Sequence, residues 1–256
     1  MKRNLLSICM VLLLVVCIAG CGKAGFDSVP YTLSLKTPEL LVEDYTKAKA
    51  GTYLLTANYE TTITTEYPQQ EIVETRVIKT TIGNYQNNYY CRIEEIVSVG
   101  DNQTGSQLTI LYGGWKYVST YDVASSTTTK LKYPYTGIYP KENTLDTLYS
   151  AIDQEAIEEI YEKVYEQENY YRLVLKLYNV NYSEDITRPE GTYYSAYSYE
   201  FGINKSGYIH MFNTYNTLLI DDWTIYRTQT IKTNLKEYGP TLYIDPPEDL
   251  NTYETV

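Results

Sequence analysis

His210 and Cys91 are the only histidine and cysteine beyond the first 21 positions, so any catalytic site that needs these residue types must use them. A Ser-His-Asp or Cys-His site would depend on His210. It lies in the apolar stretch 208–212, which favours a sheet-face histidine with ordinary hydrogen-bond partners. Cys91 alternates with Tyr89 and Ile93, a pattern that favours a buried structural thiol over a nucleophile. Two such residues are too few for a zinc site, and we expect no metal.

Paired carboxylates could supply a general acid and a general base. Adjacent pairs occur at Glu94-Glu95, Glu184-Asp185 and Asp221-Asp222. Adjacent residues of a strand point to opposite faces, so Glu94 and Glu95 are not expected to converge on a substrate, and the other pairs are expected in loops. A glycosidase with acids from distant segments stays open. There is no glycine-rich phosphate loop, and we predict a protein without enzyme activity or cofactor.

Tyrosine is the residue type best suited here to recognition, with 31 copies against 3 Phe and 2 Trp. Tyr193, Tyr197 and Tyr199 share one face of a predicted strand, where they could bind a glycan or a protein. The alternative, which we favour, is a sheet surface that uses Tyr in place of Phe or Val. Trp115 and Trp223 are expected in the core or in a pocket wall, and they complete the set of candidate ligand-binding residues.

Composition and charge narrow the classes of function. Hydrophobic residues make up 43% and charged residues 21%, which is typical of a globular chain and excludes a disordered one. The net charge of −11 makes nucleic acid a poor partner, because Lys and Arg must neutralise phosphates.

Residues 1–20 are predicted to be a signal peptide. Lys2 and Arg3 precede an apolar run, and Ile18-Ala19-Gly20-Cys21 follows. This order resembles the lipobox of bacterial lipoproteins, which implies cleavage before Cys21, acylation of its sulfur and anchoring on the extracytoplasmic face of the cell membrane. An uncleaved transmembrane helix is the alternative, but the apolar run is short for a span. With Cys21 acylated, only Cys91 would remain, and no disulfide is expected.

Residues 21–36 are predicted to be a tether and residues 37–256 a single domain. The domain begins with a helix: Thr37 is a suitable N-cap, Pro38 fits the first helical position and Gly51 ends the pattern. Its apolar residues recur at helical spacing, at Leu41, Tyr45 and Ala48.

After Gly51 the apolar period changes to 2, which indicates antiparallel strands with one buried face. Turn signals divide the following chain into strands near 53–63, 70–82, 86–99, 107–112, 115–122 and 127–133. Four more strands are expected near 170–180, 192–203, 207–218 and 222–235. A hairpin turn at Ile203–Gly207 joins the second and third of these, with Asn204 and Gly207 able to take positive φ.

Between the two sets of strands, residues 143–166 are predicted to be helical, either as one helix or as two with a bend where Asp153 caps the second. Leu145, Leu148, Ile152, Ile160 and Val164 fall on one helical face and acidic residues on the other. The acidic face is interpreted as solvated, with a docking surface as the alternative.

The order of elements resembles the LolA/LolB-like lipoprotein folds and many Gram-positive lipoproteins. The likeness rests on residues 45–53, on residues 199–209 and on Ile244-Asp245-Pro246-Pro247. It implies an α+β fold: a strongly curved antiparallel sheet, or half-barrel, with the first helix and the helical insertion across its concave side. In carriers of this family the concave space holds acyl chains.

Two functional hypotheses follow. The first is a non-enzymatic, membrane-anchored lipoprotein that binds an amphiphilic or hydrophobic ligand, or serves as an envelope sensor or assembly factor. The second is a Tyr-rich interaction module that binds cell-wall glycan or an envelope protein. The sequence identifies neither the ligand nor the oligomeric state, and it leaves open a monoderm or diderm envelope.

Overall fold

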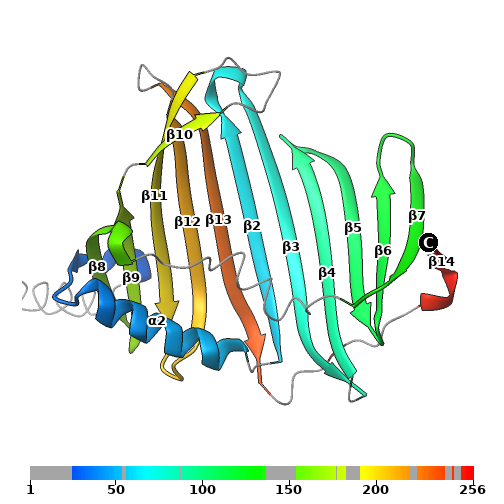
Figure 1. Cartoon of the computed structure of the whole chain (residues 1–256), viewed down its shortest axis with the longest axis horizontal. Helices are drawn as coiled ribbons and strands as arrows, with labels where there is room; N and C mark the ends of the chain where they lie inside the picture. Colours follow the sequence, from blue (N-terminus) through cyan, green and yellow to red (C-terminus); the bar gives the residue numbers. More distant parts are fainter. Residues whose placement is uncertain are drawn as a thin grey trace, which may run out of the picture.

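A computed structural model describes residues 25–53, 56–86, 88–136, 154–176, 178–182, 191–219, 224–239, 244 and 249–256. One 14-stranded sheet dominates it, in the order β1-β8-β9-β11-β12-β13-β2-β3-β4-β5-β6-β7-β14, with β10 paired to β11 (Figure 1). All pairings are antiparallel except that of β14 with β7. The sheet is open and not strongly curled.

The long strands follow the predicted alternation closely. The central meander comprises β2 (Ala57–Tyr67), β3 (Ile72–Tyr85), β4 (Asn88–Val99), β5 (Asn102–Tyr112), β6 (Trp115–Asp122) and β7 (Thr127–Pro134). The other half comprises β8 (Ile157–Tyr165), β9 (Glu168–Leu175), β10 (Tyr178–Tyr182), β11 (Gly191–Ile203), β12 (Ile209–Leu219) and β13 (Ile225–Tyr238). Short elements are η1 (Phe26–Ser28), β1 (Thr32–Leu33), η2 (Pro68–Gln70), η3 (Gln154–Ala156), η4 (Leu250–Thr252) and β14 (Glu254–Thr255).

The predicted turn between β11 and β12 is confirmed at Gly207, whose φ is +81°. Asn204 does not have a positive φ; its side-chain oxygen instead accepts hydrogen bonds from the backbone N–H groups of Ser206 and Tyr208, both at 3.0 Å. An Asx-type turn therefore fixes the hairpin.

The helix α2 (Pro38–Tyr53) is the only α-helix among the described residues, and it lies across one face of the sheet over β11 and β12 (Figure 1). Thr37 caps its first turn by accepting a hydrogen bond from the Leu40 N–H at 3.5 Å. Its buried face carries Leu41 and Tyr45, and the Tyr45 ring packs edge-on against Phe201. The predicted helix is confirmed. No helix of the described chain has the length and apolarity to cross a membrane.

The sheet is buried on both faces near the centre of the meander. Cys91 and Leu111 belong to the core cluster beneath α2, while their chain neighbours Tyr90 and Ile110 belong to a second cluster. Adjacent strand residues point to opposite faces, so the second cluster lies on the side away from α2. The C-terminal Tyr253 packs there, with its ring 5.4 Å from that of Tyr117.

Both edges of the sheet are covered by the ends of the described chain. At one edge β1 pairs with β8, and the Ser34 N–H donates to the Ile160 carbonyl at 2.8 Å. At the other edge β14 pairs with β7, and the Val256 N–H donates to the Lys132 carbonyl at 3.1 Å. The N-terminal segment 25–34 lies within the predicted tether, yet it contacts the sheet directly.

The predicted fold class is wrong: this is neither a half-barrel nor an α+β domain covered by two helical elements. Residues 157–165, predicted to be part of a helical lid, form the strand β8 and widen the sheet at its edge. The register shifts between Ile157 and Glu159, so Ile157 and Ile160 are both buried three residues apart, a spacing that imitates a helix. The rest of the predicted helix, residues 143–153, lies outside the described residues.

Candidate binding site on the polar sheet face

On the side of the sheet opposite α2, the part from β8 to β4, here called the polar face, carries one row of residues in cross-strand register; the second core cluster lies beyond it on the same side. From β8 to β4 the row reads Lys163, Tyr170, Gly202, Met211, Asn234, Glu60, Lys79 and Glu94. Residues paired directly across an antiparallel sheet share a face. The row therefore crosses seven strand intervals, a distance of about 34 Å.

A cavity of about 510 Å³ lies at the β8 end of this row. Phe26 and Tyr31 of the N-terminal segment form one side of it, and His210, Glu200 and Lys232 are among the residues of the sheet that line it. This His210 pocket is therefore a space between the N-terminal segment and the sheet, and its lining combines aromatic rings with hydrogen-bonding groups.

His210 of β12 lies close to Gly202 of β11 and to Tyr170 and Glu168 of β9. Its Nε2 is 3.1 Å from the Tyr170 hydroxyl and 3.3 Å from a Glu168 carboxylate oxygen. Burial lowers the pKa of His210, and the charge of Glu168 opposes that shift. A Cβ at Gly202 would come within 2.6 Å of the imidazole, so only glycine fits below the ring. The expected sheet-face histidine is confirmed with ordinary partners at Nε2, whereas its buried Nδ1 has no hydrogen-bond partner among the described residues.

Lys163 fixes the N-terminal segment to this end of the sheet. Its ammonium lies 3.4 Å from the centroid of the Phe26 ring, 4.5 Å from that of Tyr31 and 5.9 Å from that of Tyr170. It also donates a hydrogen bond to the Phe26 carbonyl at 3.4 Å. Burial lowers the pKa of Lys163, partly offset by the charge of Glu200. Such cation–π contacts stabilise by about 0.5–2 kcal/mol.

Glu200 is the acceptor in the floor of the His210 pocket. The Tyr215 hydroxyl donates to it at 3.0 Å and the Asn213 amide at 3.2 Å, while Arg172 lies 3.9 Å away. Burial, with the Glu200 charge as a second cause, raises the pKa of Tyr215 to about 12. The phenol therefore stays protonated and acts as a hydrogen-bond donor at neutral pH.

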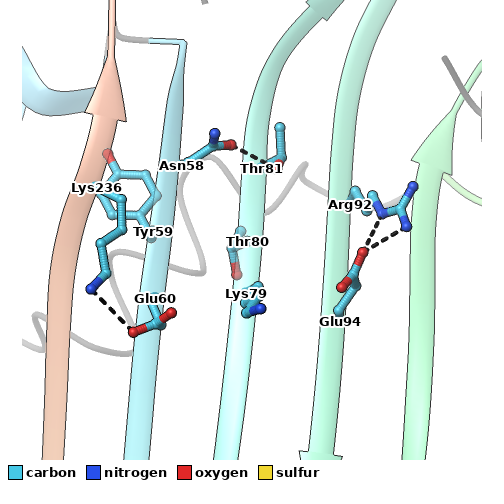
Figure 2. A pocket seen from close by; sticks show the side chains of 9 residues that line it. All are labelled: Asn58, Tyr59, Glu60, Lys79, Thr80, Thr81, Arg92, Glu94 and Lys236. Carbon is cyan, nitrogen blue, oxygen red and sulfur yellow. Dashed lines mark hydrogen bonds and ion pairs between the residues drawn. The ribbon is translucent and has the colours of Figure 1, made fainter. Parts of the chain in front are cut away.

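A second cavity, of about 220 Å³, lies further along the row and is here called the Lys79 pocket (Figure 2). Glu60 binds Lys236 at 3.1 Å, and Glu94 binds Arg92 at 2.6 Å. Lys79 stands in register between the two glutamates, and no dashed line joins its ammonium to either of them in Figure 2.

The two pockets adjoin along the row. Asn234 lines the His210 pocket and Glu60 lines the Lys79 pocket, and these two residues are direct cross-strand partners. A ligand in one pocket can therefore extend into the other along the row.

Two of the three predicted recognition tyrosines, Tyr197 and Tyr199, lie on the opposite side, the face that α2 covers. Tyr199 packs against the core there, with its ring 5.8 Å from that of Phe212. Tyr197 has the same strand parity as Tyr199 and pairs with the buried Asn216. The side chain of Tyr193 lies outside the described part of the chain. The structure therefore does not place these residues in the polar pockets.

The other predicted residues fall in the core or outside the described chain. Trp115 packs against the second core cluster, with the Lys132 ammonium 5.6 Å from the centre of its ring system. Cys91 is fully buried, which raises the pKa of its thiol to about 12, and the prediction of a structural thiol is confirmed. Cys21 and Trp223 lie outside the described residues.

Of the three predicted carboxylate pairs, only Glu94-Glu95 lies within the described residues, and its two carboxylates do not converge; Glu184-Asp185 and Asp221-Asp222 lie outside them. Glu94 binds Arg92 on the polar face, whereas Glu95 points to the other face and lies 3.5 Å from Arg76, as alternation predicts. Within the described ranges, no three His, Cys, Asp or Glu residues group as metal ligands would.

Sequence reasoning missed Tyr31, Lys163, Tyr215 and Lys79. Each is an ordinary residue of a polar strand or segment, and only the complete fold brings them together: Lys163 and Lys79 lie in the row, while Tyr31 and Tyr215 line the His210 pocket beside it. The available signal was the set of charged residues Glu60, Lys79 and Glu94, one on each of three strands. Their proximity could be inferred only if the pairing of β2, β3 and β4 were known.

No family model matches this sequence. No curated protein matches it either. Among solved structures, the chain has a weak likeness to one described as the crystal structure of MucB in complex with MucA(peri), at 9% identity and a TM-score of 0.14, covering 78% of this chain and 93% of that one.

Proposed function

We propose that this protein is a lipid-anchored binding protein on the extracytoplasmic face of the cell membrane, and that it binds an extended glycan across the polar face without chemical conversion. The observation that carries the ligand proposal is the adjoining pair of polar pockets in one row of the sheet. The lipobox-like segment ending at Cys21 supports the anchor.

The lining of the two pockets favours a glycan over an acyl chain. Hydroxyl, amide, carboxylate and ammonium groups line the two pockets, and aromatic rings that border the His210 pocket, such as Tyr31 and Tyr215, carry hydroxyls. A carrier of acyl chains needs an apolar cavity. Such a cavity was expected only because the sheet was predicted to be strongly curved, and the sheet is open.

A glycan also suits the geometry better than a peptide. Extended peptides usually add to a sheet edge, where backbone groups are unpaired, whereas this row crosses the interior strands of the sheet. A folded protein partner would be expected to insert an apolar anchor into a pocket, and the row is polar.

The anchor is tested by replacing Cys21 with Ser in the full chain. We expect loss of acyl-chain incorporation and release of the protein from the membrane fraction. Incorporation of labelled fatty acid measures this directly, and continued labelling of the variant would contradict the proposal.

The ligand is tested with purified cell-wall polysaccharide and the full chain. Asn234→Ala, at the junction of the pockets, should weaken binding about three- to tenfold, the effect of losing one or two hydrogen bonds. Asn251→Ala is the matched control, because Asn251 is exposed in η4 away from the row. Equal binding of both variants and the unmodified protein would contradict the proposed site.

A further inference from the structure

We infer that the glycan is acidic and that Lys79 and Lys232 bind its acid groups. This inference rests on the proposed function and specifies the ligand class for the same face. The two lysines lie in adjoining pockets, Lys79 on β3 and Lys232 on β13.

The Lys79 pocket contains three cations and two carboxylates, and the carboxylates are already bound. The Lys236 ammonium forms an ion pair with Glu60 at 3.1 Å, and two nitrogens of Arg92 bind Glu94 at 2.6 and 2.7 Å. Among the described residues, the Lys79 ammonium has neither an ion pair nor a hydrogen bond, although both glutamates are its cross-strand neighbours.

Lys232, in the floor of the His210 pocket, also has an ammonium without an ion pair among the described residues. Its cross-strand neighbours are Asn213 and Thr62, neither of which is charged. The nearby acceptor Glu200 is held by Tyr215, Asn213 and Arg172. Within the described chain the Lys232 ammonium likewise has no ion pair.

Unpaired lysines are notable in this chain because acidic residues outnumber basic ones by 32 to 21. Each ammonium offers three N–H donors, and none is used by a described residue. The two strands are separated by two strand intervals, about 10 Å. An extended chain with acid groups at regular intervals can therefore meet both cations at once, while neutral hydroxyls meet the groups between them.

The test compares one probe in two forms. An oligogalacturonate long enough to span the row carries free carboxylates, and its fully methyl-esterified form has the same backbone without charge. Binding of the full chain to each form is measured by titration calorimetry at fixed ionic strength. We expect the free acid to bind about tenfold more tightly than the ester, as two exposed charge contacts would give.

Lys79→Gln and Lys232→Gln should each remove about three- to fivefold of that preference, and the double variant should bind both forms equally. Lys205→Gln is the matched control, since Lys205 is exposed in the turn between β11 and β12 and its substitution changes the net charge identically. All three positions are exposed, so the variants should fold normally, as circular dichroism would verify.

Equal binding of the acid and the ester by the unmodified protein would overturn this inference and leave the glycan proposal intact. A preference that survives in the double variant would also overturn it. If the protein bound neither form of the oligogalacturonate nor the wall polysaccharide, the proposed function itself would be overturned.

Discussion

At the scale of single residues, tyrosine gives this protein buried area and hydrogen bonds from the same side chain. Tyr45 packs its ring against Phe201, while Tyr170 joins His210 to Glu168 and Tyr215 donates to Glu200. An amphipathic ring can border a polar pocket without exposing a purely apolar surface. The surplus of Tyr over Phe is thus consistent with a sheet whose polar and apolar regions lie side by side.

Gly202 should be intolerant of any side chain. The substitution Gly202→Ala places a Cβ 2.6 Å from the His210 ring and 2.9 Å from the Tyr170 ring, both of which are packed. We expect a loss of about 1–3 kcal/mol in the free energy of unfolding, measured by urea denaturation.

Gly105→Ala is the control, because a Cβ there meets only the Tyr121 carbonyl at 3.5 Å, an ordinary contact. It should leave stability unchanged or slightly raised, since alanine restricts the unfolded chain. If the two variants were equally stable, the close approach at His210 would not constrain position 202.

The stability of the protein should depend on His210 below neutral pH. Burial lowers its pKa from the ordinary 6.5, so just below that pH the unfolded chain binds a proton that the folded chain does not. The free energy of unfolding therefore falls as the pH is lowered through this range. In His210→Gln the decrease between pH 7 and 5 should be smaller, as chemical denaturation at each pH would show. Identical pH profiles would contradict this assignment.

At the scale of elements, the sequence predicts the helices and strands whose formation depends on neighbouring residues of the chain. The helix from Pro38 follows from its cap and its periodic apolar residues, and the strands of the meander follow from alternation. β8 could not be predicted this way, because its bulge places buried residues at 157 and 160. The polar row could not be predicted either, since it depends on the register between strands such as β13 and β2, which are distant in sequence.

The packing of α2 is tested by two adjacent leucines. Leu41 is fully buried against the sheet, whereas Leu40 is 53% exposed. Leu41→Ala should lower the free energy of unfolding by about 2–5 kcal/mol through cavity formation. Leu40→Ala should change it by less than about 0.5 kcal/mol. Equal effects in thermal denaturation would contradict the observed orientation of the helix.

At the scale of the whole molecule, each edge of the sheet is covered by a two-residue strand near an end of the described chain. Such edges offer unpaired backbone groups to other chains. Deleting residues 254–256 removes β14 and the hydrogen bond from Val256 to Lys132. We expect the truncated protein to self-associate as concentration rises, as sedimentation velocity would show.

The control keeps the backbone and changes only side chains, with Glu254→Ala and Thr255→Ala together. This variant should remain as dispersed as the unmodified protein, because β14 pairs through its backbone. If the truncated protein behaved in the same way, Lys130, Lys132 and Pro134 on β7 would suffice to protect that edge.

The attachment of the N-terminal segment also has a mechanical consequence. A pull applied to the chain ahead of Phe26 acts first on the ring contacts around Lys163 and then on the two-residue strand β1. The interior strands, up to 14 residues long, are held along most of their length and carry load only afterwards. We therefore expect the segment to detach under forces that leave the sheet folded, and to dock again when the tension ends.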